Sequence, residues 1–136
     1  MRKLLFAIVF LMTISTYSQQ EKEWILIDDS ESETIYIRKR TDDSAWFKTV
    51  YKNDKTKAKA DSGYDEVVRK SLVLFKFECI NLMMGVLSSL KYDKDGNVIT
   101  SNNVNEFLIQ MEYVVPDSYG EFIFEYFCDN NWFTNI

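Results

Sequence analysis

Residues 92–100 read YDKDGNVIT, and this short stretch indicates the fold class more clearly than any other part of the chain. An Asp-Gly step between two extended runs is among the strongest local signals for a β-hairpin, because glycine readily adopts the backbone angles of a tight turn. The β-branched residues at positions 98–100 suit the returning strand. The chain is therefore predicted to contain an antiparallel sheet with one of its turns at residues 93–97.

The segment before this hairpin, residues 66–84, is ambiguous when it is taken alone. Alternate apolar positions fit a strand with one buried face, whereas a second, overlapping set fits the spacing of a helix. The strand set is Val73, Phe75, Phe77 and Cys79, and the helix set is Val68, Leu72, Phe75, Cys79, Leu82 and Val86. A strand that leads into the hairpin favours the first interpretation, and the pattern alone leaves the second open.

Three further strands are expected upstream, at residues 24–27, 34–38 and 45–52, which are rich in aromatic and β-branched side chains. Alternation in the third gives one face with Trp46, Lys48, Val50 and Lys52, and another with Phe47, Thr49 and Tyr51. If Trp46 or Tyr51 is exposed, it could form a recognition patch.

Two segments connect these strands to the end of the domain. Residues 53–65 are hydrophilic and are predicted to be an exposed connection. Residues 105–115 carry apolar side chains at alternate positions and are predicted to be the last strand. Pro116 should end that strand, because proline cannot donate a hydrogen bond to the ladder.

A C-terminal helix is expected after Pro116. Ser118 and Glu121 have the spacing of a capping box, and Phe122, Ile123, Tyr126 and Phe127 supply an apolar stripe. The predicted fold class is therefore α+β: an antiparallel β-sheet of about six strands packed on a C-terminal α-helix, in a single domain.

The amino terminus has the features of a secretory leader. Arg2 and Lys3 precede an apolar run at residues 4–14, which is shorter than the ~20 residues that a membrane-spanning helix needs. Small residues near the end of the leader suit signal peptidase, so cleavage is predicted between Ser18 and Gln19. The alternatives are an uncleaved membrane anchor and a buried helix, and the polar residues that follow at once argue against both.

We therefore expect residues 1–18 to be a signal peptide and residues 19–136 to be the mature domain. The destination would be the periplasm, the outer surface or the medium. No cysteine lies near the cleavage site to accept a lipid, the first being Cys79. No stable membrane anchor is thus expected after cleavage.

The charged residues limit the classes of function. The chain has 16 Lys and Arg, 21 Asp and Glu and no His, which gives a net charge of −5. Loss of the leader would remove two cations and no acid, so the mature domain would be more acidic still. An acidic domain disfavours nucleic-acid binding, and the absence of His excludes Ser-His-Asp, Cys-His and His-dependent zinc sites. No cofactor or metal is expected, and catalysis by paired carboxylates is the one route left open.

The two cysteines, Cys79 and Cys128, are predicted to form a disulfide, because an exported chain enters an oxidising compartment. The alternative is a pair of buried free thiols. A bridge over roughly fifty residues would stabilise the fold by about 4 kcal/mol in the chain-entropy model. It would join the strand that ends at Cys79 to the C-terminal helix.

Three charged segments are candidate sites. Residues 93–97 suggest a calcium loop, but their glycine stands too early for an EF-hand, so a hairpin turn is favoured. Basic residues at 38–40 and 55–59 could form a patch for an acidic partner or glycan, and a solvated strand edge is the simpler account. Acidic residues at 28–33 could supply a carboxylate pair for glycoside hydrolysis, but a polar turn gives no cleft.

The order of these features resembles the bacterial surface-adhesin protein E family. The matching features are Trp24 in the first strand, AWFK at 45–48, the strand ending at Cys79, the hairpin at 92–101, VPDS at 115–118 and the terminal Cys128. The resemblance implies an exported domain whose antiparallel sheet cradles a C-terminal helix. It departs from the family where residues 111–115 read MEYVV, because the family usually has a Trp shortly before its Pro-x-Ser element. No binding residue of the family matches this chain, so the resemblance assigns no site residue.

The resemblance and the composition together predict an exported binding module of the cell envelope without catalytic activity. Its expected partner is a protein or glycan ligand at the cell surface, and a homodimer is a further candidate. The alternatives are a structural subunit of an envelope complex and, as a weaker one, a small carboxylate-dependent hydrolase.

Overall fold

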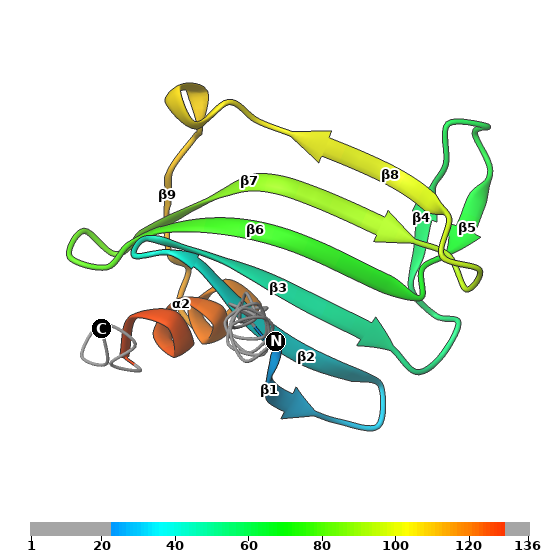
Figure 1. Ribbon diagram of the computed structural model, residues 1–136, viewed down its shortest axis with the longest axis horizontal. Coiled ribbons are helices and arrows are strands. Elements are labelled where there is room, and N and C mark those ends of the chain that lie inside the picture. The colour runs from blue at the N-terminus through cyan, green and yellow to red at the C-terminus, as the bar shows by residue number, and fades with distance from the viewer. Residues whose placement is uncertain (1–22, 130–136) are drawn as a thin grey trace, which may run out of the picture.

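Residues 23–129 are described by the computed structural model, in which a curved antiparallel sheet lies against one helix (Figure 1). The strands of the sheet are β1 (Ile25–Asp29), β2 (Glu33–Thr41), β3 (Ser44–Tyr51), β6 (Lys70–Glu78), β7 (Met83–Tyr92), β8 (Val98–Asn103) and β9 (Glu112–Tyr113). A separate hairpin consists of β4 (Lys57–Lys59) and β5 (Asp65–Val67), and the helix α2 is Tyr119–Asp129. The predicted α+β class is confirmed.

The predicted signal peptide, residues 1–18, lies outside the described residues, as does its cleavage site between Ser18 and Gln19. Within residues 23–129, no helix is long and apolar enough to cross a membrane.

The sheet is built mostly from strands that are neighbours in the sequence. Its order is β1-β2-β3-β6-β7-β8, every pairing is antiparallel, and the β4–β5 hairpin lies in the connection from β3 to β6. β8 pairs with the second half of β7, and the short β9 pairs with its first two residues, Met83 and Met84. Residues 66–84 therefore form strands and a turn, which confirms the strand interpretation of that ambiguous segment.

The turn between β7 and β8 confirms the hairpin predicted at residues 92–100. The Asp93 carboxylate accepts 2.9 Å hydrogen bonds from the backbone amides of Asp95 and Asn97, and Gly96 adopts a φ of +84°. The bond from the Asn97 amide is the main reason that the pKa of Asp93 lies below its usual range. The carboxylate thus stabilises the turn by accepting its amide hydrogen bonds. Within residues 23–129, no cluster of three or more acidic, Cys or His side chains could hold a metal ion.

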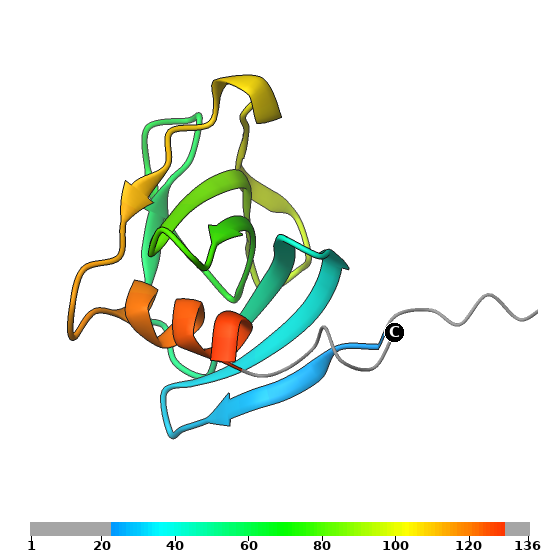
Figure 2. The same ribbon diagram turned by 90° about the vertical axis from the view of Figure 1, so that its left-hand side faces the viewer.

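Alternation along the strands gives the sheet two different faces. The inner face is the one that α2 partly covers, as Figure 2 shows along the strands, and it carries the pair Ile37 and Phe47. The outer face is the opposite one, and it carries the next pair, Arg38 and Trp46. The face predicted for Phe47 and Thr49 is therefore the buried one.

The main core lies between α2 and the inner face. Its fully buried members are Ile35, Ile37, Ala45, Phe47, Phe77, Ile123, Phe124 and Phe127. The rings of Phe77 and Phe127 stack with centroids 4.2 Å apart, which ties the middle strand β6 to the helix. The helix therefore contributes the apolar stripe that its sequence predicted, although Phe122 is 40% exposed.

Side chains close the start of α2 as the sequence predicted. The Ser118 hydroxyl accepts a 3.1 Å hydrogen bond from the Glu121 amide. The Glu121 carboxylate in turn accepts a 3.3 Å bond from the amide of Asp117. These bonds satisfy amide groups that have no partner within the helix itself.

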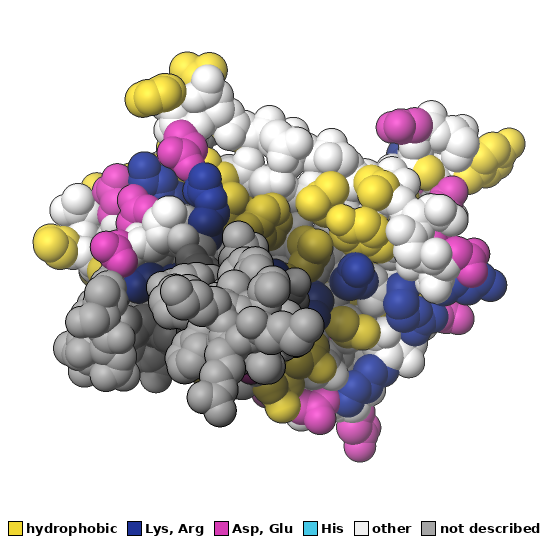
Figure 3. All heavy atoms as spheres, viewed as in Figure 1, with side chains coloured by type: hydrophobic (Ala, Val, Ile, Leu, Met, Phe, Trp, Pro, Cys, Tyr) yellow, Lys and Arg dark blue, Asp and Glu magenta, His cyan; other side chains and the backbone are white. Residues whose placement is uncertain are grey.

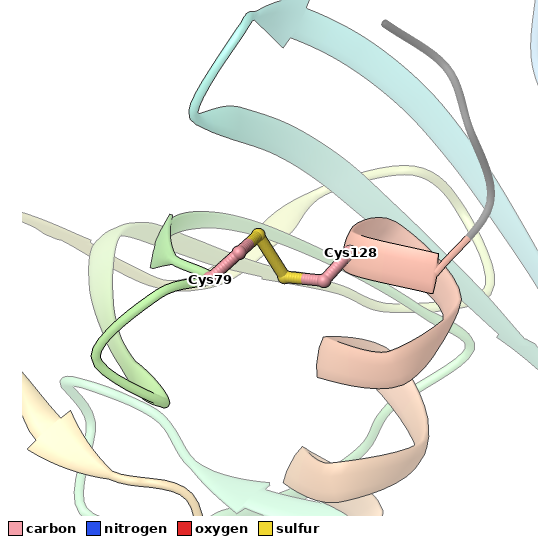
Figure 4. Close-up of a disulfide and its surroundings, with 2 residues drawn as sticks. All are labelled: Cys79 and Cys128. Carbon is pink, nitrogen blue, oxygen red and sulfur yellow. A yellow bond between two sulfur atoms is a disulfide. The ribbon is translucent and has the colours of Figure 1, made fainter.

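Cys79 and Cys128 form the predicted disulfide (Figure 4). Their Cα atoms are 5.7 Å apart, and 49 residues separate them in the sequence. The bridge joins the residue directly after β6 to the last turn of α2. It therefore reinforces the same strand-to-helix contact that the stacked rings make.

The prediction of an exposed connection at residues 53–65 was wrong in part. These residues contain β4 and lead into β5, and Ala58 is buried in a small cluster with Val68 and Ile99. The Val68 amide donates a 2.9 Å hydrogen bond to the Thr56 carbonyl, which holds the hairpin against the start of β6. Strands of three residues are too short to give a periodic pattern, so the sequence did not reveal them.

The prediction of a last strand over residues 105–115 was also wrong for most of its length. A short 3-10 helix, η1 (Glu106–Leu108), begins where the Asn105 side chain accepts a hydrogen bond from the Phe107 amide. Only β9 pairs with the sheet. Between them the chain crosses Gly85 so closely that a Cβ there would lie 2.9 Å from the Gln110 carbonyl oxygen. The position of the apolar side chains between η1 and β9 is therefore set by this crossing over Gly85, and not by strand pairing.

Candidate binding surfaces

The outer face of the sheet carries a group of aromatic, basic and leucine side chains that we call the outer stripe. Register places them in three rows across the strands. Tyr36, Lys48, Leu72 and Leu90 form the first row, Arg38 and Trp46 belong to the second, and Lys70 and Tyr92 belong to the third. Trp24, just before β1, completes the stripe beside Arg38.

Cation–π contacts hold the basic groups of the outer stripe in place. The Lys48 ammonium lies 4.5 Å from the ring centre of Trp24 and 4.6 Å from that of Tyr36. Lys70 lies 4.5 Å from the ring centre of Tyr92 in the same way. A ring attracts a cation without neutralising it, so these lysines keep their positive charge available to a partner.

The positive charges of the outer stripe also act on one another. Partial burial is the main cause that lowers the pKa of Lys48, and the neighbouring cations Lys70 and Arg38 lower it further. A positive charge close to Lys48 disfavours its protonated form, which is why Lys70 and Arg38 lower its pKa. An anionic ligand would relieve that repulsion.

A hollow of about 390 Å³ opens in the outer stripe. It is lined by Trp24, Arg38, Lys39, Arg40, Trp46, Leu72 and Leu90. Figure 3 shows hydrophobic and basic side chains next to each other over the middle strands of this face. Two of the lining cations are paired at the rim, Lys39 with Asp42 at 3.3 Å and Arg40 with Glu106 at 2.9 Å.

The inner face has a second cavity, which we call the inner trough, beside the first residue of α2, Tyr119. Its volume is also about 390 Å³. Register aligns Thr49, Ser71 and Lys91 in one row across it. Its remaining lining residues are Glu33, Phe47, Tyr51, Val73, Phe75 and Tyr119.

Tyr119 closes the inner trough on the side of the helix. Tyr119 is 50% exposed, and its partial burial raises the pKa of the phenol, while a hydrogen bond with the Thr49 side chain opposes this effect more weakly. Tyr51 was predicted, with Trp46, to form a recognition patch if it was exposed. It lines the inner trough, whereas Trp46 lies on the outer face. The two aromatic residues therefore serve opposite faces of the sheet.

The acidic turn at residues 28–33 does not bring its carboxylates together. Asp29 accepts a 2.6 Å hydrogen bond from Lys52 and a 3.0 Å bond from Thr34, and the Lys52 bond is the main cause that lowers the Asp29 pKa. Glu33 lies at the inner trough. A glycosidase acid needs a raised pKa beside a second carboxylate, and Asp29 has the opposite shift.

The two basic runs also separate in space. Within residues 38–40, Arg38 joins the outer stripe, whereas Lys39 and Arg40 make the rim ion pairs. Lys57 and Lys59 are exposed on β4, at the hairpin. Only Arg38 and the two rim cations therefore contribute to the hollow, and the sequence did not single out Lys48 or Lys70 as members of the same surface.

Comparison with known proteins adds no relative to this description. No family model matches the chain, and neither curated proteins nor solved structures give a match.

Proposed function

We propose that the protein is an exported binding module of the cell envelope, similar to the surface-adhesin protein E family and without catalytic activity. Its outer stripe would bind an acidic segment of another protein. The observation that carries the proposal is the composition of this stripe, which combines Trp24, Tyr36, Trp46 and Tyr92 with three cations.

Charge supports an acidic partner. The chain as a whole has a net charge of −5, yet among the described strands the one carboxylate that the register aligns in the three rows is Asp29, at the β1 edge of the third row, where Lys52 pairs with it. The positive potential is therefore local to this face. Local charge complementarity steers association and selects partners, even when the net charge of the protein has the opposite effect.

Residue type supports a protein partner. Trp, Tyr and Arg are the residues that contribute most often to binding energy at protein–protein interfaces. The hollow between Trp24, Trp46 and Leu72 offers a place for an apolar anchor, with Arg38 in its lining and Lys48 next to Leu72 in the first row. An acidic segment with an apolar side chain near its middle would fit both features.

The structure also suits an exported protein. Both cysteines are joined in a disulfide, which is typical of oxidising compartments and agrees with the predicted signal peptide.

The test is a pull-down with the exported, oxidised protein, obtained by expressing the full chain, against extracellular-matrix and serum proteins. The double variant K48Q/K70Q removes two stripe cations, and K57Q/K59Q is the matched control because it removes the same charge from exposed positions on β4. We expect K48Q/K70Q to weaken retention about tenfold or more, with stronger loss at high salt, and the control to change it less than about twofold.

Equal retention by both double variants would contradict the stripe as the binding surface. Stripe-dependent binding of heparin, with no protein retained, would replace the protein partner by an anionic glycan. A defined complex with an envelope protein on size-exclusion chromatography, unaffected by K48Q/K70Q, would favour a structural subunit instead.

A further inference from the structure

We infer that the inner face holds a second binding site, for an amphiphile with one anionic head group and an acyl chain, such as a long-chain fatty acid. The site combines the inner trough with a neighbouring apolar cavity. It lies on the face of the sheet opposite the outer stripe, so it is independent of the function proposed above.

The head-group end of the site is defined by Lys91 and Ser71, which are partners across β7 and β6. Ser71 is only 6% exposed, and within residues 23–129 its hydroxyl has no hydrogen-bond partner. Lys91 has no ion-pair partner in the same part of the chain. A buried hydroxyl without a partner is costly, and a bound carboxylate would satisfy it together with the ammonium group.

The acyl chain would follow β6 away from this end. Ser71, Val73 and Phe75 occupy alternate positions on the inner face, so the path from Ser71 to Phe75 is about 13 Å long at the rise of an extended strand. Val73 and Phe75 give that path an apolar floor. The polar and apolar parts of the trough are thus arranged in the order of an amphiphile.

A larger cavity continues the path beyond Phe75, which lines both. Its volume is about 550 Å³, within the range of ordinary ligand sites. The apolar side chains that line it with Phe75 are Met84, Val86, Val104, Leu108, Tyr113, Val114 and Val115. The segment that crosses Gly85 forms one wall of this cavity.

Exposure of apolar surface at this cavity supports an apolar occupant. Leu108 is 77% exposed, Val115 is 65% exposed and Val86 is 43% exposed, although all three line the same hollow. Clustered apolar exposure of this kind marks binding sites more often than isolated exposed residues do. An acyl chain in the cavity would cover these side chains.

The position of Glu33 decides the sign of the head group. Glu33 lies on β2, at the far side of the trough, whereas the larger cavity is bordered by β6 and β7. A cationic head paired with Glu33 would hold the acyl chain three strands away from β7. An anionic head at Lys91 keeps it directly beside the apolar path.

The inference is tested by calorimetric titration of the exported, oxidised protein with dodecanoate, dodecanol and dodecyltrimethylammonium below their aggregation limits. We expect dodecanoate to bind at least about tenfold more tightly than either other probe, because only it carries a charge opposite to Lys91. K91Q should weaken dodecanoate binding about tenfold, and the control K57Q, which removes an exposed lysine on β4, should change it less than about twofold.

A second variant tests the tail. Val86→Asn places a polar group in the larger cavity and should weaken dodecanoate binding, while butanoate, which is too short to reach Val86, should bind equally weakly to both proteins. Melting temperatures of all variants would establish that they are folded. Equal affinity of K91Q and the original chain for dodecanoate, or equal affinity for dodecyltrimethylammonium and dodecanoate, would overturn the inference.

Discussion

The two ends of the inner face differ in how they are packed. At the helix end, eight buried residues and the disulfide join the sheet to α2. At the hairpin end, only Ala58, Val68 and Ile99 form a buried cluster, and a two-stranded hairpin covers them. Between the ends lies the inner trough, which Tyr51 and Tyr119 border. The difference shows that buried contacts concentrate at the helix end, while the middle of the face carries polar groups at a cavity. We therefore expect the helix end to contribute most of the stability.

The largest effect is expected at the helix end, from Phe77→Ala. Phe77 is 2% exposed and contacts four other Phe rings, so its loss should leave a cavity and reduce the free energy of unfolding by about 3–5 kcal/mol. Urea unfolding measures the change. Phe107→Ala is the control, because Phe107 is 95% exposed and should change stability by less than about 0.5 kcal/mol. Similar losses in both variants would show that the helix end is not the centre of stability.

The next effect is expected from removal of the bridge in the variant C79S/C128S. The free energy of unfolding should fall by about 2–4 kcal/mol, because the unfolded chain gains the freedom that the closed loop denies it. Urea unfolding without reductant compares the variant with the original chain. Reductant should destabilise the original chain by a similar amount and leave the variant unchanged. If opening of the bridge, verified by thiol labelling, leaves stability intact, the disulfide does not reinforce the helix end.

A smaller effect is expected at the hairpin end from Val68→Ala. Val68 is fully buried, and removal of its two methyl groups should cost about 1–2 kcal/mol. Hydrogen exchange would locate the change, since amides of β4 and β5 should exchange faster while those of α2 keep their protection. Equal acceleration at both ends would mean that the two clusters unfold as one unit.

The smallest effect is expected between the two ends, from Tyr119→Phe. Because the folded protein raises the pKa of Tyr119, its phenol keeps its proton more firmly in the folded state than in the unfolded state. That contribution to stability is complete below the usual tyrosine pKa near 10 and is lost as the pH rises through the folded value. Melting temperatures between pH 8 and 11 should therefore fall more steeply for the original chain than for the variant. Parallel curves would show that the fold does not raise the pKa of this phenol.

Apart from the disulfide, which followed from the count of two cysteines, the parts of the fold that the sequence predicted correctly depend on residues close together in the chain. The turn at Asp93 and the helix start at Ser118 each use hydrogen bonds within four residues. Of the two parts that it predicted wrongly, residues 53–65 hold strands too short to show a pattern, and residues 105–115 are shaped by a distant contact with Gly85. Alternating apolar side chains such as Phe107 and Tyr113 look like one face of a strand, yet both are exposed. No feature of the local sequence distinguishes this alternation from that of a strand that is paired in a sheet.

The candidate sites were harder to predict than the fold, because their residues come together only through the pairing register of the strands. Lys48 meets Trp24 and Tyr36 only after three separate segments are aligned, and Ser71 meets Lys91 in the same way. A shift of one residue in any pairing would turn these side chains to the other face. The sequence could place Trp46 on the face of Lys48, since both belong to one strand, but it could not show which strands lie beside them.

The bridge between Cys79 and Cys128 also determines how the molecule would respond to mechanical tension. A force applied to the two ends of the chain would pass from β6 through the sulfur atoms to the end of α2. The 49-residue span between the cysteines would carry no load, and about 160 Å of extended chain could never be pulled out. β7 and β8 would thus remain folded or unfold only for other reasons, while β1, β2 and β3 would bear the strain of any partner held under flow.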